Sequence, residues 1–118
     1  MNLQDIRDYF DSQFPEVAPK QLAAAYAAWA ISRSNTYASQ LIQGFEGTHA
    51  PGWLLPDNNL YAALKFLDNN GLAEGYWLSI NDQPRPRRMY KPAPGREDKL
   101  RELGELFAQW KIENIGGD

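Results

Sequence analysis

Residues 84–91 read PRPRRMYK and place four cations and two prolines in one short segment. Proline has no backbone N–H to give to a neighbouring strand, so Pro84 and Pro86 confine this segment to an exposed edge. The preceding residues 72–80 are rich in residues that favour strands, and Asn81-Asp82-Gln83 has the composition of a turn. The sequence therefore predicts a two-stranded ribbon over 72–91 whose second strand, 85–91, is basic.

Helical periodicity precedes the ribbon. Leu60, Leu64 and Leu67 form one apolar stripe in residues 57–70, which end on the helix-stop signal Asn70-Gly71. Similar stripes predict helices over 3–10, from 19 to about 31, and from about 36 to Gly44 or Gly47. Helices followed by a basic ribbon are typical of a winged helix-turn-helix, whose last helix enters a DNA groove. We predict a mainly α fold with a small β-wing, an α+β winged helix-turn-helix.

The last predicted helix, over about 96–113, carries an apolar seam with coiled-coil spacings of three, four and three residues: Leu100, Leu103, Phe107 and Trp110. A regular seam on a lone surface helix is most simply explained by a partner helix, so we predict that these four residues form a dimer interface. The expected organisation is one compact domain with three parts. These are an N-terminal helical arm (1–18), the winged helix-turn-helix (19–93) and a C-terminal dimerisation helix (94–118).

The net charge of −3 conceals an uneven distribution along the chain. Residues 1–83 carry a net charge of −5, residues 84–101 carry +5, and residues 102–118 carry −3. Exposed charges more than about 8 Å apart are largely screened at physiological salt, so the local field governs binding to phosphate. A net acidic chain can therefore present a basic edge to DNA.

The residues needed for metal binding and for catalysis are largely missing from this sequence. Without cysteine there is no disulfide framework and no thiolate zinc site, and the single histidine, His49, has no neighbours suited to a metal or a catalytic triad. No glycine-rich phosphate loop or nucleophile motif is present, so we expect neither an enzyme nor a cofactor. The longest apolar run, 22–31, is half of the roughly 20 residues that span a bilayer, which favours a cytoplasmic protein without membrane contact.

The candidate DNA-contacting side chains lie on the outward face of helix 57–70 and on the basic strand: Asn58, Asn59, Tyr61, Lys65, Arg85, Arg87, Arg88 and Lys91. Asparagine suits bidentate reading of adenine, whereas Lys65, further along the helix, suits the DNA backbone. Arginine suits bidentate phosphate contact or a narrow minor groove. In a strand Arg87 and Arg88 face opposite ways, and we expect Arg88 to have a structural partner such as an acidic side chain.

The helix and ribbon resemble the PadR family of winged-helix transcriptional regulators. In that family a Leu-Tyr-x-x-Leu-x-x-Leu helix is followed by Gly-Leu and by a wing close to Arg-Pro-Arg-Arg-x-Tyr-Arg. This chain has Leu60-Tyr61, Leu64, Leu67, Gly71-Leu72 and the segment 85–91 in the same order and spacing. The resemblance covers roughly residues 26–95. One departure is the family's His-Gly-Tyr, which reads Asn35-Thr36-Tyr37 here.

The resemblance implies a homodimer that binds a pseudo-palindromic operator and represses transcription. We predict a sequence-specific regulator of double-stranded DNA, with helix 57–70 in the major groove and wing 72–91 on the backbone or minor groove. Two alternatives stay open: a winged-helix protein-interaction module, favoured by the acidity of residues 1–83, and a repressor that responds to a small aromatic effector. Some relatives stack planar compounds near the dimer helix, which makes Trp110 the candidate effector residue. Trp29, Trp53, Trp77 and Trp110 are all expected in the core or an interface.

Overall fold

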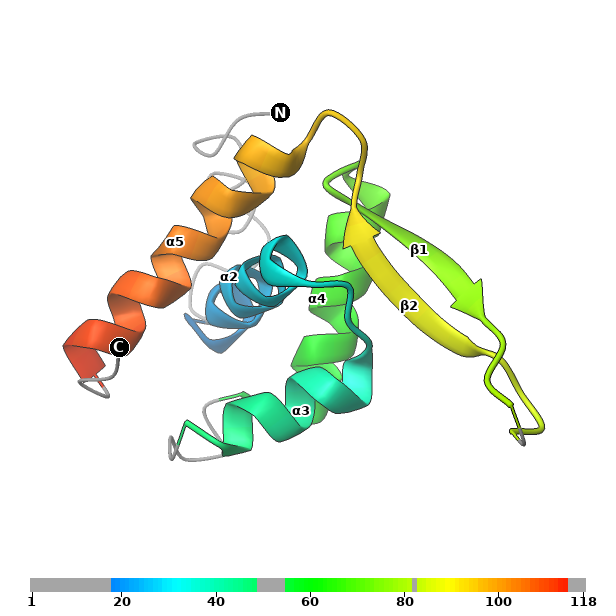
Figure 1. The fold of residues 1–118 in the computed structure, drawn as a ribbon. Coiled ribbons are helices and arrows are strands. Elements are labelled where there is room, and N and C mark those ends of the chain that lie inside the picture. Colours follow the sequence, from blue (N-terminus) through cyan, green and yellow to red (C-terminus); the bar gives the residue numbers. More distant parts are fainter. Residues whose placement is uncertain (1–17, 49–54, 82, 115–118) are drawn as a thin grey trace.

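The computed structural model describes residues 18–48, 55–81 and 83–114, which form helices and one two-stranded sheet (Figure 1). The helices and strands are, in chain order, α2 (Ala18–Arg33), α3 (Ala38–Glu46), α4 (Asp57–Asn69), β1 (Ala73–Leu78), β2 (Arg87–Pro92) and α5 (Glu97–Asn114). The fold class predicted from the sequence, mainly α with a small β-wing, is confirmed. The predicted helix 3–10, His49 and Trp53 lie outside the described residues.

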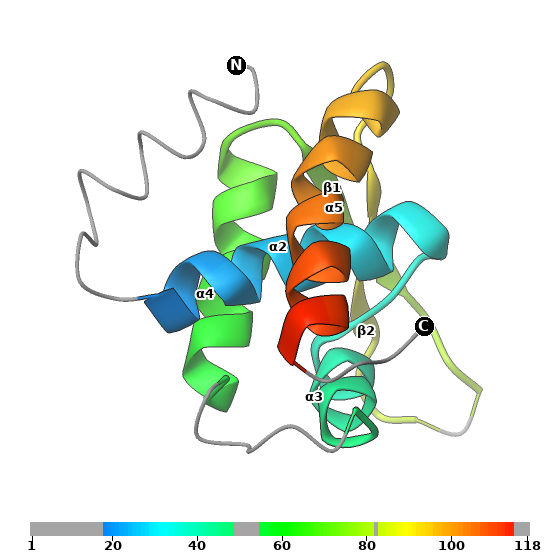
Figure 2. The ribbon, with the colours of Figure 1, turned by 90° about the vertical axis from the view of Figure 1, so that its left-hand side faces the viewer.

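Helix α2 is the centre of the core and packs on both α4 and α5. Six consecutive residues of α2, from Ala23 to Ala28, are buried, and five of them are alanines that let neighbouring helices come close. In α5, a Cβ on Gly104 would lie 2.7 Å from Trp29 Cα and 2.9 Å from Trp29 N. Because real Cβ atoms do not approach backbone so closely, only glycine at position 104 allows this crossing of α5 over α2 (Figure 2).

The apolar seam of α5 faces α2 of the same chain. Leu100, Leu103 and Phe107 are at most 2% exposed and belong to the same buried cluster as the α2 alanines. The prediction that these three residues form a dimer interface is therefore wrong. The seam does meet a partner helix, but that helix is α2 rather than a helix of a second copy. Trp110 is half-buried, and its ring is stacked 5.9 Å from Phe107 and 6.5 Å from Phe45.

Helix α4 buries one face and exposes the other. Leu60, Ala63, Leu64 and Leu67 are its buried residues, and the helix ends one residue before the predicted 70. Gly71 follows with a φ of 71°, a left-handed conformation that glycine adopts without strain. This stop turns the chain into β1, so that the strand begins beside the C-terminal end of α4.

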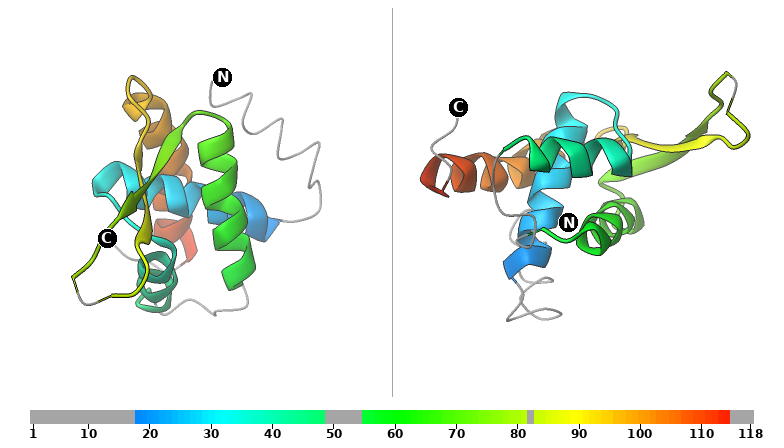
Figure 3. Two further views of the ribbon diagram at one scale, coloured as in Figure 1. Left: turned by 90° about the vertical axis from the view of Figure 1, so that its right-hand side faces the viewer. Right: turned by 90° about the horizontal axis from the view of Figure 1, so that it is seen from below.

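Strands β1 and β2 form an antiparallel ribbon, the wing, in which Ala73 is opposite Pro92 and Leu78 is opposite Arg87. The second strand begins at Arg87 rather than at the predicted Arg85. Pro84 and Pro86 cannot donate to the ladder, so Arg85 lies in the tip of the wing instead of in the strand. The wing extends well beyond the helical body (Figures 1 and 3).

Candidate nucleic-acid interface

The two elements predicted to meet DNA lie next to each other. Seen from the side of the wing, α4 stands beside β1 and β2, and the wing leaves the body from that side (Figure 3). Helix α5 lies on the other side of the molecule, with α2 packed between it and α4 (Figure 1). The predicted DNA-contacting residues of α4 and of the wing are thus carried by adjacent elements.

The outward face of α4 carries a stripe at helical spacing. Asn58, Tyr61 and Lys65 are all exposed, and Tyr61 retains 55% of its accessible surface. Asn59 is half-buried, and its backbone N–H donates to Pro56 O at 2.9 Å in the first turn. A long exposed side chain such as Lys65 and the amide of Asn58 can each reach a partner that approaches along this face.

Arg85 and Arg87 differ in how firmly they are held. Arg85 is exposed in the wing tip, and no ion pair or hydrogen bond joins it to the described part of the chain. The Cζ of Arg87 lies 3.9 Å from the centroid of the Tyr37 ring, so its guanidinium is stacked on an aromatic face. Stacking orders the planar group and leaves its N–H edge free to donate to phosphate oxygens.

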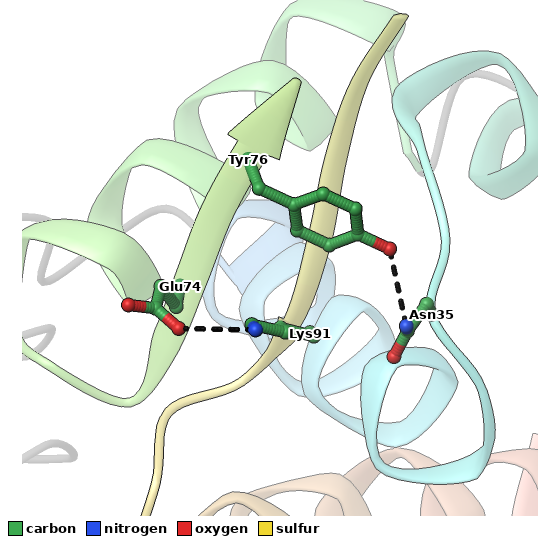
Figure 4. Close-up of polar contacts among 4 residues, drawn as sticks. All are labelled: Asn35, Glu74, Tyr76 and Lys91. Carbon is green, nitrogen blue, oxygen red and sulfur yellow. Dashed lines mark hydrogen bonds and ion pairs between the residues drawn. The ribbon is translucent and has the colours of Figure 1, made fainter. Parts of the chain in front are cut away.

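Lys91 lies at the base of the wing in a pair within the sheet. Its Nζ is 3.5 Å from Glu74 Oε2, the residue directly opposite in the register, and 5.4 Å from the centroid of the Tyr76 ring (Figure 4). Because the Glu74 carboxylate offsets its charge, Lys91 contributes less positive field at the wing surface than Arg85 or Arg87 does.

Arg88 points to the opposite face of the wing from Arg87 and has the acidic partner predicted for it. Its Nη2 is 3.6 Å from Asp68 Oδ2, in the last turn of α4. Its Cζ also lies 5.0 Å from the centroid of Trp77, the residue directly opposite in β1. Arg88 is therefore connected both to its neighbouring strand and to α4.

The connection between α2 and α3 docks on the wing through three consecutive residues. Asn35 Nδ2 donates to Tyr76 Oη at 3.1 Å (Figure 4), and Tyr37 lies under Arg87. Between them, Thr36 exchanges backbone hydrogen bonds with Tyr90: Thr36 N–H donates at 3.1 Å and Tyr90 N–H at 2.8 Å. In the sequence, Asn35-Thr36-Tyr37 stands out as a departure from the family motif. Its role as a wing support needed the fold.

Trp77 is exposed, so of the two locations expected for it, the core or an interface, the core is excluded. It retains 64% of its surface, and the adjacent Leu78 retains 43%. The reason is that none of the described helices lies over the outer half of the wing (Figure 3), so neither face of β1 is buried there. Trp110 and Trp29 do lie in the aromatic cluster around Phe107, as expected. An effector role for Trp110 stays a prediction.

In residues 18–48, 55–81 and 83–114, no group of three or more histidine, cysteine, aspartate or glutamate residues is arranged to hold a metal ion. None of the helices there has the length and apolar character needed to cross a bilayer.

Comparison with known proteins gives matches among solved structures. No family model and no curated protein matches the chain. Pex from Synechococcus sp. strain PCC 7942 is 37% identical with a TM-score of 0.69, over 93% of this chain and 97% of that chain. The circadian clock associated protein Pex from Anabaena is 30% identical with a TM-score of 0.68, over 93% and 95%. A PadR-like transcription factor from Bacteroides fragilis is 27% identical with a TM-score of 0.60, over 92% and 94%.

The fold, the exposed helix α4 and the arginine-bearing wing define a winged-helix, DNA-binding transcriptional regulator. The chain belongs to the PadR-like family of these regulators, as the motif shared by α4 and the wing predicted.

Proposed function

We propose that the protein represses transcription by binding a pseudo-palindromic operator as a homodimer. In this proposal α4 enters the major groove, and the wing contacts the flanking backbone or minor groove. The observation that carries it is that an exposed Asn–Tyr–Lys stripe on α4 and the arginines of the wing are on adjacent elements at one side of the molecule. Two such helices in a dimer would meet successive major grooves about 34 Å apart.

The side chains divide the work by their position. Asn58, Asn59 and Tyr61, in the first turns of α4, would meet base edges, and Lys65 would meet a phosphate. Arg85, which is free of described partners, and Arg87, ordered by Tyr37, would grip the flanking phosphates or the minor groove. Lys91 would add a weaker contribution, since Glu74 lies beside it.

A dimer would need a surface of α5 other than its buried seam. Ile112 of α5 is 64% exposed, and the half-buried Leu106 and Trp110 pack against the edge of the core. Helix α5 and the wing lie on opposite sides of the body (Figure 1), so a second copy that covers α5 would not block the DNA-binding face. We propose this surface, with the N-terminal residues, as the dimer contact.

The operator can be found by selecting fragments of genomic DNA with the purified protein. We expect enrichment of an inverted repeat whose half-sites are about one helical turn, roughly 10 base pairs, apart. Because one of the similar Pex proteins is described as circadian clock associated, promoters of clock-associated genes are the first individual fragments to test. Selection without any shared sequence would contradict sequence-specific binding and favour the protein-interaction module.

A further inference from the structure

We propose that Arg88 is a positioning residue that holds the wing at a fixed angle to the recognition helix α4, rather than a phosphate contact like Arg85 and Arg87. This inference rests on the proposed DNA-binding function, because its consequence is how well α4 and the wing engage one duplex together. It divides the three wing arginines into two that reach outward and one that acts within the molecule.

The first support is where the Arg88 guanidinium lies. It leaves β2, lies near the Trp77 ring with Cζ 5.0 Å from the centroid, and ends with Nη2 3.6 Å from Asp68 Oδ2. Trp77 belongs to β1 and Asp68 to the last turn of α4, so one side chain of β2 contacts both the neighbouring strand and the helix. Arg85 and Arg87 make no such contact with α4 in the described part of the chain.

The second support is Gly75, which makes room for this path. A Cβ on Gly75 would lie 2.6 Å from Arg88 Nη2 and 2.8 Å from Arg88 Cζ. Glycine weakens a strand interior, because it adds backbone entropy and packs nothing against its neighbours. A glycine in this six-residue strand is explained if the Arg88 guanidinium occupies the space that a side chain at position 75 would fill.

The third support is the position of Asp68. A carboxylate in the last turn of a helix meets the negative end of the helix dipole, so the helix itself does not favour aspartate there. The Arg88 cation offsets this unfavourable interaction, which explains why an aspartate is tolerated at position 68. The pair is only weakly stabilising, since both side chains are more than a third exposed, so its effect is expected on geometry rather than on stability.

The decisive variant is Asp68→Asn, with Glu74→Gln as its matched control. Each removes one negative charge, but Glu74 pairs with Lys91 within the sheet, whereas Asp68 links the sheet to α4. By charge alone, both changes should tighten binding to DNA. If Arg88 positions the wing, Asp68→Asn binds the selected operator about threefold more weakly, and Glu74→Gln binds it equally well or more tightly. Equal or tighter binding by Asp68→Asn would overturn the proposal.

Gly75→Ala tests the same idea without changing any charge. The added methyl group displaces only the end of a flexible side chain, so the protein is expected to fold. If Arg88 were a phosphate contact, its displacement from Gly75 would leave the affinity for DNA unchanged or raise it. If Arg88 positions the wing, the affinity for DNA should fall about threefold. In an Arg88→Ala background, Gly75→Ala should have no further effect, because the group that it displaces is gone. If Gly75→Ala lowered the affinity for DNA about threefold in that background as well, the effect would come from the strand itself and not from Arg88.

The salt dependence of Arg88→Ala separates the two roles. A lost phosphate contact reduces the slope of log affinity against log salt by about 0.9 for each phosphate no longer neutralised. A positioning residue lowers affinity at every salt concentration and leaves the slope unchanged. A slope reduced by about 1.8 for the dimer would therefore contradict the proposal.

A measurement without DNA keeps the inference distinct from the proposed function. Residual dipolar couplings of wing and α4 amides should fit one common orientation in the wild type and in Glu74→Gln. In Asp68→Asn and Gly75→Ala the wing couplings should be reduced relative to those of α4. If the couplings change as expected but the wild type binds no DNA, the proposed function fails and the positioning role stands. If the wild type binds DNA and the couplings do not change, the positioning role fails and the function stands.

Discussion

At the scale of single residues, Tyr26 shows how the core constrains one polar group. Its hydroxyl donates to Leu41 O at 2.6 Å, and its ring lies 4.9 Å from Phe107 and 5.6 Å from Phe45. A Cβ on Gly44 would come within 2.7 Å of the hydroxyl, so glycine there makes space for it. Burial raises the pKa of Tyr26 to about 12, because the phenolate is poorly solvated inside the protein.

We expect the stability of the protein to fall above pH 10 through Tyr26. Its pKa is about 10 in the unfolded chain and about 12 in the fold, so this contribution is complete below pH 10 and is lost as pH rises towards 12. Tyr26→Phe should lower the free energy of unfolding by about 1 kcal/mol at neutral pH and make the alkaline decline shallower. Urea unfolding at pH 8, 10 and 11 measures both effects.

The exposed tyrosine at position 61 supplies the control. Tyr61→Phe should leave the free energy of unfolding at neutral pH close to that of the wild type. An unchanged decline in Tyr26→Phe would show that other groups cause it.

At the scale of elements, the sequence predicted α4, α5 and the wing closely, because their signals are local: apolar stripes, a glycine stop and proline-limited strands. It could not predict which surface covers the α5 seam, since spacings of three and four are the same for a helix of the same chain and for one of a second copy. Nor could it assign Gly75, Gly104 or Asp68, whose roles depend on atoms from distant parts of the chain. Strand composition did not reveal that the ribbon lacks a covering layer, so the sequence could not show that Trp77 lies outside the core.

Leu103→Ala tests the packing of α5 on α2. Leu103 is 2% exposed in the core of a single chain, so its truncation should lower the free energy of unfolding by about 2–5 kcal/mol. Leu78→Ala, at an exposed position of the wing, is the matched control and should cost only about 0.5 kcal/mol. Chemical unfolding measures both. If Leu103→Ala instead gave stable, folded monomers from a wild-type dimer, the seam would belong between copies.

At the scale of the whole molecule, α2 separates two surfaces. The wing and α4 lie on one side, and the outward face of α5 lies on the other (Figure 1). Dimer formation and DNA contact are therefore expected to be separable by mutation, and each contributes to affinity. Joining two half-site readers raises affinity through effective concentration without any new contact.

Ile112→Glu tests the proposed dimer surface. Because Ile112 is exposed, the fold should persist, while a charge placed in an apolar contact should shift sedimentation towards monomers. Binding to a full operator should weaken by at least about 100-fold, the lower end of the gain from linked sites, and binding to a single half-site should not change. A variant that stays dimeric would move the interface away from this part of α5.

The most direct test of the central claim, that α4 and the arginine wing bind DNA together, is the salt dependence of operator binding. A dimer that neutralises six phosphates should give a slope of log affinity against log salt of about −5. Replacing Arg85 and Arg87 with alanine removes four cations from the dimer and should make that slope less steep by about 3–4, with the fold intact by circular dichroism. A slope near zero in the wild type, or an identical slope in the double variant, would contradict the account.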